Sequence, residues 1–189
     1  MADSGTHAVF ATVGTDHHPF DRLIGWLDGW LEAGDLPPAA CFVQHGASAV
    51  PGRALHAPYI GYDEMDAAVR DAPAVVCHGG PGSIMLATYH GKRPIVVARR
   101  KELGEHVDDH QVLFTRRLAE AGEIDLVESE EELRLLLDAR LAGAVEVTGG
   151  RSRDVVADSV RYFEERVAAL LSTDRHRRVG WLRPRHRPL

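Results

Sequence analysis

The sequence predicts an α/β protein built on a single doubly wound, mainly parallel sheet. Short apolar segments alternate with amphipathic helical segments along most of the chain. The apolar segments are continuous, with no alternation of polar residues, as in strands that helices cover on both faces. Three of them run directly into glycine-containing loops at residues 14–16, 45–46 and 78–83. Because ligands of such sheets bind beyond the carboxyl ends of the strands, we expect a ligand site at these loops.

The first strand and helix show these signals clearly. Residues 9–13 are a short β-prone run that Gly14 and Thr15 close. After Pro19, apolar residues recur with the spacing of one buried helical face, and Gly34 ends the pattern. The residues of this face are Phe20, Leu23, Ile24, Leu27 and Leu31.

The middle of the chain continues the alternation. Residues 41–44 form a second strand, and residues 55–60 form a weaker third strand before a short helix at 63–70. A fourth strand at 74–77 breaks at the segment His78-Gly79-Gly80-Pro81-Gly82. The chain then looks helical from Ser83 to His90, and Gly91 ends that helix. Residues 95–98 follow as a fifth strand, with a charged loop at 99–108 after it.

The last expected elements carry helix caps. Asp109 is expected to cap a helix that Gly122 ends. The apolar face of this helix would consist of Leu113, Phe114 and Leu118. A sixth strand is expected at 124–127. Ser129 and Glu132 then have the spacing of a capping box, followed in phase by Leu133, Leu136 and Leu137. A final amphipathic helix is expected over residues 156–170.

Composition excludes several classes of protein. The chain has 189 residues, of which 44% are hydrophobic and 26% charged, as in an ordinary globular domain. No run of about eighteen apolar residues predicts a membrane span, and the first residues do not resemble a secretory signal. Cys41 and Cys77 lie in strand-like runs, which fits a reducing compartment. We expect a cytoplasmic domain at residues 7–173.

The net charge of -6 is unevenly distributed. Residues 174–189 contain six arginines and one aspartate, so the acidic excess belongs to the rest of the chain. An acidic body argues against a nucleic-acid-binding domain. The basic tail either contacts an anionic membrane face or is a solvated terminus.

The segment 77–83 is the strongest candidate for a binding site. Glycines let backbone amides approach a ligand closely, and the helix that follows offers unpaired N–H groups at its positive dipole end. A pyrophosphate suits such a site. Ser83 could cap this helix or donate to a phosphate oxygen. The sequence lacks the dinucleotide-binding, P-loop and α/β-hydrolase glycine motifs.

A second cluster lies in residues 105–111. His106 and His110 have the i, i+4 spacing of two metal ligands on one helical face, with Glu105 or Asp109 as a further ligand. A helix that begins near Asp109 leaves His106 in the loop, and the segment would then lie over the ligand crevice as a polar loop.

Taken in order, five segments resemble the C-terminal, donor-binding domain of family 28 glycosyltransferases. They are Thr12-Val13-Gly14-Thr15, Phe20-Asp21-Arg22-Leu23-Ile24, His78-Gly79-Gly80-Pro81-Gly82-Ser83, Gly91-Lys92-Arg93-Pro94-Ile95-Val96-Val97 and His110-Gln111. The resemblance spans roughly residues 9–125. Within this family, the chain most resembles stand-alone small subunits that pair with a membrane-bound acceptor subunit. Such subunits act in dolichol-linked oligosaccharide synthesis and in bacterial exopolysaccharide synthesis.

The resemblance implies half of a GT-B fold, a UDP-sugar as substrate, inverting hexosyl transfer, and no metal or other cofactor. The amides around Gly79, Gly80, Gly82 and Ser83, next to His78, would hold the diphosphate. Gly14 and Thr15 would line the cleft between donor and acceptor. Tyr62 would lie against the uracil, and His110 and Gln111 would contact the donor sugar.

Two residues depart from the family pattern. Leu86 stands where the family commonly has a glutamate that binds the ribose hydroxyls, and Arg93 is an extra residue in a Gly-Lys-Pro turn. Inverting transfer also needs a general base, for which this chain offers Asp16 and His17 as candidates. The resemblance implies that the base of complete enzymes comes from the other half of the cleft, whereas 189 residues have the length of one domain. We therefore expect a membrane-associated partner that supplies the acceptor site, at the inner face of the membrane.

Two other functions stay open at this stage. The first is a non-catalytic module that binds a nucleotide sugar, which Leu86 favours. The second is a metal-dependent hydrolase built around His106 and His110.

Overall fold

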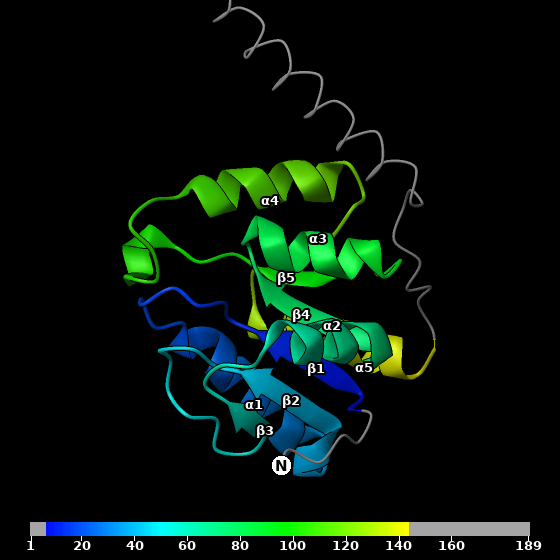
Figure 1. Ribbon diagram of the computed structural model, residues 1–189. Coiled ribbons are helices and arrows are strands. Elements are labelled where there is room, and N and C mark those ends of the chain that lie inside the picture. Colours follow the sequence, from blue (N-terminus) through cyan, green and yellow to red (C-terminus); the bar gives the residue numbers. More distant parts are fainter. Residues whose placement is uncertain (1–6, 144–189) are drawn as a thin grey trace, which may run out of the picture. The chain divides into compact units, whose positions relative to one another are not determined.

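The computed structural model describes residues 7–143 and confirms the predicted fold class. Six parallel strands form one sheet in the order β3-β2-β1-β4-β5-β6 (Figure 1). The strands are β1 (Val9–Thr12), β2 (Cys41–Gln44), β3 (Leu55–Ala57), β4 (Ala74–His78), β5 (Ile95–Val97) and β6 (Asp125–Leu126). The α-helices are α1 (Asp21–Ala33), α2 (Tyr62–Asp71), α3 (Pro81–Tyr89), α4 (His110–Glu120) and α5 (Glu130–Leu141). Single 3-10 turns occur at Pro38–Ala40 and Lys101–Leu103.

The strand order reverses direction at β1. This strand pairs with β2 on one side, Val9 lying opposite Cys41, and with β4 on the other, Val9 lying opposite Ala74. The chain thus winds outward from β1 in both directions, and the loops after β1 and β4 emerge side by side at the switch point. In open α/β sheets this is the position at which ligands bind.

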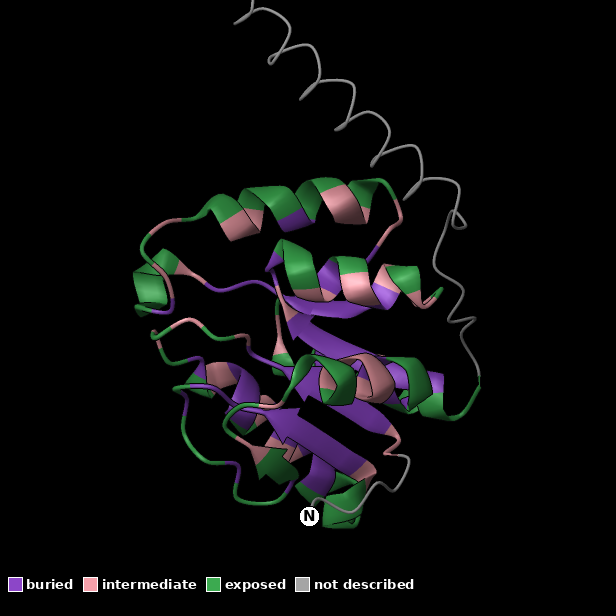
Figure 2. Ribbon diagram, in the orientation of Figure 1, coloured by how far each residue is buried: buried purple, intermediate pink, exposed green. Residues whose placement is uncertain are grey.

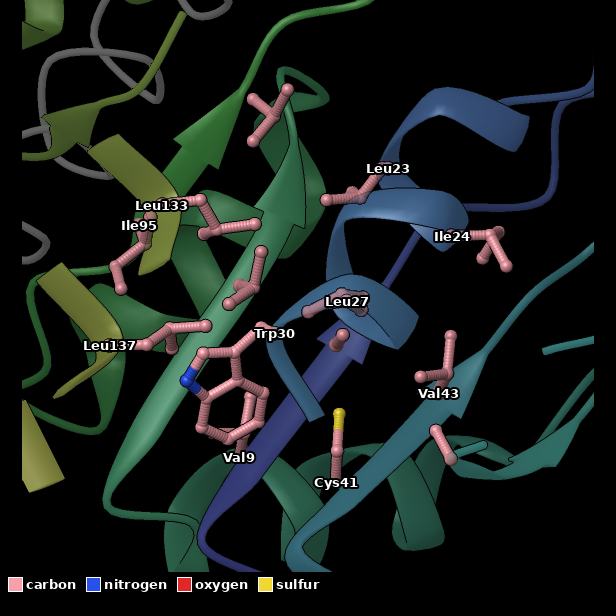
Figure 3. Close-up of a cluster of buried hydrophobic side chains, with 14 of the residues drawn as sticks. Val9, Leu23, Ile24, Leu27, Trp30, Cys41, Val43, Ile95, Leu133 and Leu137 are labelled. Atoms are coloured by element: carbon pink, nitrogen blue, oxygen red, sulfur yellow. The ribbon is translucent and has the colours of Figure 1, made fainter. Parts of the chain in front are cut away.

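The sheet is covered on both faces. Helices α1 and α5 pack on one face around Leu23, Leu27, Trp30, Leu133 and Leu137 (Figure 3). Helices α2, α3 and α4 cover the other face, where two smaller apolar clusters form. The central strands are accordingly buried along their length, whereas the short edge strand β3 is largely exposed (Figure 2). The continuous apolar runs of the sequence follow from this double cover.

Helix α4 corrects two expectations. Leu113 and Phe114 are 61% and 37% exposed, so they do not form its buried face, and Thr115 is the fully buried residue instead. The side that packs on the sheet runs through Thr115 and Leu118, one helical turn apart. Asp109 does not cap the helix with its side chain: its carboxylate accepts the Lys101 amide, while Asp108 accepts the amide of His110.

The capping box of α5 is confirmed in a modified form. The Ser129 hydroxyl accepts the amide of Glu132 at 3.3 Å, and the Glu132 carboxylate reaches back to the amide of Glu128 at 2.9 Å. The expected helix at 156–170, the domain end at 173 and the basic tail at 174–189 lie outside the described residues. Among the helices of residues 7–143, none has the length and apolar character needed to cross a membrane.

We expect Leu137→Ala to lower the free energy of unfolding by about 2–5 kcal/mol, because it opens a cavity between α5 and the sheet. Leu135→Ala on the same helix is the matched control, since Leu135 is 57% exposed. Urea denaturation of the two variants measures the difference. Equal losses would contradict the packing of α5 on this face.

Candidate functional site

The glycines after β1 and β4 make room for the imidazole ring of His78. Gly14 has a φ of +81°, and a Cβ added there would lie 2.6 Å from the ring. A Cβ on Gly80 would also collide with the ring, at Nε2. The ring therefore fills the space between the two loops at the switch point. Any side chain at either glycine would push His78 out of place.

Gly14 is also fixed from the side of β2. The side-chain amide nitrogen Nε2 of Gln44 donates to the carbonyl oxygens of Gly14 at 3.0 Å and Pro58 at 2.8 Å. The Thr12 hydroxyl donates to Gln44 Oε1. Gly46, with a φ of +55°, passes so close that a Cβ would lie 2.7 Å from the Gly14 carbonyl. Three neighbouring loops are thus held together by contacts that only glycine allows.

The N-terminus of α3 is open to a ligand. Gly80 is the N-cap residue and no side chain caps the helix, while Pro81 occupies the first position and lacks an N–H. The amides of Gly82 and Ser83 lie in the first turn, where no intrahelical acceptor exists. A Cβ on Gly82 would meet nothing within 4 Å. These amides, at the positive end of the helix dipole, form a site suited to an anion.

Gln111 lies against the same loop. A Cβ on Gly79 would come within 2.9 Å of Thr115 and 3.1 Å of the Gln111 side chain, so α4 packs directly on Gly79. Gln111 Oε1 is buried and has no hydrogen-bond donor within residues 7–143. The side-chain oxygen of Gln111 thus lies beside the loop as an unused hydrogen-bond acceptor.

The loop between β5 and α4 does not form the metal site that the sequence left open. Glu105 forms a two-point ion pair with Arg22, at 2.8 Å for each oxygen. His110 is 84% exposed and pairs with Asp108 at 2.9 Å. His106 lies 3.4 Å from the same carboxylate. Glu105 is thus taken up by Arg22, and among residues 7–143 the side chains of this cluster do not bring three ligand atoms close enough together to hold a metal ion.

Buried Arg99 holds the loop after β1 against the loop after β5. Its guanidinium donates to the carbonyl oxygens of Val13 at 2.7 Å, His18 at 2.7 Å and Glu105 at 2.9 Å. Burial lowers the pKa of Arg99, and the Asp16 and Glu105 carboxylates act against that shift. The two loops lie side by side at the carboxyl edge of the sheet (Figure 1).

Asp16 is hydrogen-bonded to His18 and not to His17, the histidine that the sequence analysis offered with it as a candidate base. One oxygen of its carboxylate accepts the His18 amide at 2.7 Å and the His18 ring Nδ1 at 2.6 Å. These bonds, the amide contributing most, lower the pKa of Asp16 to about 2. His17 is 84% exposed, with its Nδ1 3.8 Å from Asp16. Of the two histidines in this loop, His18 is therefore the one that hydrogen bonds hold in place.

Of the other residues singled out in the sequence, Thr15 and Tyr62 lie at the carboxyl edge of the sheet. Thr15 is exposed beside Gly14, and Tyr62 is 73% exposed at the first position of α2. Leu86 packs with the apolar cluster between α2 and α3. Arg93 pairs with Asp125 at 2.6 Å before β5 begins, at the opposite edge of the sheet. Its insertion therefore serves the packing of β5 on β6 and does not bear on the site.

Sequence reasoning missed three residues of the site: His18, Arg99 and the ion-paired Arg22. An arginine directly after an apolar strand was the available signal for Arg99, because a buried cation at that place needs partners from neighbouring loops. The Asp-x-His spacing was the signal for His18. Nothing in the sequence indicated that Arg22 would reach Glu105.

His78 gives the site a pH dependence. Burial, and secondarily the Arg99 charge, lower the pKa of His78 to about 4. An unfolded chain takes up this proton near pH 6.5, so stability falls as the pH drops from there towards 4. Between about pH 7 and pH 4.5, we expect the free energy of unfolding of His78→Gln to fall by about 2 kcal/mol less than that of wild type, because the variant lacks this titrating ring. Urea denaturation at the two pH values measures this, and equal losses would contradict the burial of a neutral ring.

Comparisons with known proteins agree with this architecture. The solved structure of ALG13 shares 16% identity and has a TM-score of 0.50, over 77% of this chain and 90% of that one. MurG of Acinetobacter baumannii shares 20% identity, with a TM-score of 0.49 over 70% of this chain and 41% of that one. The glycotransferase of kitacinnamycin shares 15% identity, with a TM-score of 0.49 over 74% of this chain and 38% of that one.

The chain thus spans about two fifths of the length of the latter two proteins. No curated protein sequence matched it. The fold is that of a Rossmann-like half of a GT-B glycosyltransferase. The sequence profile of the glycosyltransferase family 28 C-terminal domain matches residues 44–139, just over half of the chain. The chain therefore belongs to glycosyltransferase family 28, as a C-terminal domain.

Proposed function

We propose that this chain is the donor-binding, catalytic subunit of an inverting UDP-sugar glycosyltransferase. One observation carries the proposal: the uncapped N-terminus of α3, with free amides at Gly82 and Ser83, opens at the switch point of the sheet. Membership of family 28 supports sugar transfer as the reaction. In this proposal the enzyme is a hexosyltransferase.

The diphosphate would bind to the amides at Gly79, Gly80, Gly82 and Ser83. As the sugar leaves, negative charge develops on the β-phosphate, and donors that are already aimed at it stabilise the transition state without reorganisation. The dipole of α3 contributes in the same direction. These groups account for stabilisation of the leaving group, so the proposed mechanism uses no metal and no other cofactor.

The nucleoside and the sugar would lie on either side of the diphosphate. Tyr62 offers an exposed aromatic ring to the uracil at the N-terminus of α2, the neighbour of α3 on the same face (Figure 1). Gln111, with its unpartnered oxygen, and exposed His110 would contact the sugar hydroxyls. Leu86 is packed among apolar side chains, so the ribose hydroxyls must find another acceptor.

The acceptor site would come from a membrane-associated partner subunit. Leu103, Val107 and Leu113 are 53%, 61% and 61% exposed on and beside the loop between β5 and α4. Exposed apolar side chains on this one segment, beside the proposed site, would fit an interface with the partner. The complex would act at the cytoplasmic face of a membrane on a lipid-linked or polysaccharide acceptor, as in exopolysaccharide synthesis. The free, buried thiols of Cys41 and Cys77 fit that compartment.

A second candidate function is a module that binds a nucleotide sugar without transferring it. The observation in its favour is Leu86, which replaces a charged ligand of the ribose with an apolar packing residue. Turnover of UDP-sugar by the chain together with its partner supports the enzyme. Binding without turnover in that complex supports the module.

We expect Gly80→Val to abolish binding of UDP, because its side chain would collide with His78 and displace the loop. Isothermal titration of UDP into the full chain measures this. Gly25→Ala is the control: it lies in α1, its Cβ has no neighbour within 4 Å, and it should leave UDP binding unchanged. Undiminished binding in Gly80→Val would show that the diphosphate site is elsewhere.

Gln111→Ala should distinguish binding of the donor sugar from binding of the nucleotide. If Gln111 contacts the donor sugar, its loss weakens UDP-sugar binding about tenfold, the value of one hydrogen bond of roughly 1.4 kcal/mol, and leaves UDP binding unchanged. Titration of UDP and of UDP-N-acetylglucosamine into the same variant makes the comparison. An equal loss for both ligands would mean that Gln111 acts only by packing on Gly79.

A further inference from the structure

Asp16 and His18 form a hydrogen-bonded dyad at the carboxyl edge of the sheet. The Asp16 carboxylate lies 2.6 Å from His18 Nδ1. Because the pKa of Asp16 is lowered to about 2, this carboxylate is ionised near neutral pH and can only accept. The proton of a neutral His18 ring therefore sits on Nδ1, and Nε2 presents its lone pair. In the same way, the carboxylate of a catalytic triad fixes the tautomer of its histidine.

The backbone of His18 is held in place on both sides. Its amide donates to Asp16 at 2.7 Å, and its carbonyl oxygen accepts from the buried Arg99 at 2.7 Å. No hydrogen bond of Nε2 is formed within residues 7–143, and the side chain is 23% exposed. The ring is thus oriented and partly exposed, as a general base needs to be.

The dyad is close to the proposed donor site. The loop that carries it begins at Gly14, which touches the ring of His78, and the Asp16 charge acts on the pKa of His78. His78 in turn contacts Gly80 at the entrance to α3. The base and the amides that hold the diphosphate would therefore lie on adjoining loops of one chain.

We propose that His18, oriented by Asp16, is the general base of sugar transfer. His18 Nε2 takes the proton of the acceptor hydroxyl while the oxygen of that hydroxyl bonds to the anomeric carbon. The bond from this carbon to the β-phosphate oxygen breaks, and its electron pair leaves with UDP. The Asp16 carboxylate stabilises the imidazolium that results. This assignment rests on the proposed function and replaces His17 by His18 as the residue that acts.

One oxygen or ring nitrogen from each of the side chains of Asp16, His17 and His18 lies close enough to the others to bind a common cation. The Asp16 oxygen that would face it already accepts two hydrogen bonds from His18, so the geometry favours the dyad. A chelator distinguishes the two: the dyad predicts that EDTA leaves turnover unchanged. Loss of turnover in EDTA, restored by Zn²⁺, would overturn it.

Hydrolysis of the donor tests the base without the acceptor, because water takes the place of the acceptor hydroxyl. The full chain is incubated with UDP-glucose and with UDP-N-acetylglucosamine, and release of UDP is followed. His18→Gln should lower kcat about 10²- to 10⁴-fold, with little change in KM or in UDP binding by titration. Asp16→Asn should give a smaller loss. Added imidazole should restore part of the activity of His18→Gly, which would not happen if His18 only supported the loop.

His90→Gln is the matched control. His90 forms a similar pair with Asp66, at 2.8 Å, but it lies at the C-terminal end of α3, away from the glycine loop. This variant should keep wild-type turnover. The assignment would be overturned if His18→Gln kept the wild-type kcat, or if His17→Gln lost activity and His18→Gln did not. It would also be overturned if the wild-type chain bound UDP but released no UDP from UDP-sugars. If wild type does not bind UDP at all, the proposed function fails.

Discussion

The buried guanidinium of Arg99 is the interaction on which the arrangement of the site depends. It donates to carbonyl oxygens on the β1 side, at Val13 and His18, and on the β5 side, at Glu105. A buried cation is costly unless its N–H groups find acceptors, so the bonds from Nη1 and Nη2 favour the observed positions of these loops, although Nε has no partner within residues 7–143. Glu105 adds the second cation, Arg22, which also stacks over the ring of Trp26. Charge and hydrogen bonding thus hold these two loops against each other.

Close backbone approach is the second constraint. Gly14 and Gly80 leave the volume that His78 fills, and Gly79 leaves the volume that Thr115 and Gln111 fill. These contacts bring α4 onto the loop after β4, next to the first amides of α3, which have no partner in the helix and no side-chain cap. The same lack of side chains that allows tight packing therefore leaves peptide nitrogens accessible to an anion. Packing and ligand binding depend on the same few residues.

Much of the fold was predictable because the apolar pattern is strong where the sheet is covered twice. The runs at 9–13, 41–44 and 74–77 are buried strands, and the helical spacing of Leu23, Leu27 and Leu31 matches the buried face of α1. The buried face of α4 was not predictable in this way, because the helix lies at the edge of the fold. There, apolar Leu113 faces solvent while Thr115 is buried and bonds to carbonyls one turn back.

The site was predictable in part. The glycine loop could be found because several glycines around a proline, directly after a buried strand, indicate a tight turn with accessible amides. The dyad was indicated only by its Asp-x-His spacing, because the sequence does not decide whether His17 or His18 bonds to Asp16 until the backbone turns. Arg99, Glu105 and Arg22 are far apart along the chain, and no local pattern predicts a contact between residues 22 and 105.

A crystal structure of the full chain with UDP tests the central claim most directly. Our account predicts that the diphosphate oxygens lie about 3 Å from the amide nitrogens of Gly80, Gly82 and Ser83, with the His78 ring still between Gly14 and Gly80. A diphosphate bound elsewhere on the molecule, with these amides facing only solvent or the Gln111 side chain, would contradict it.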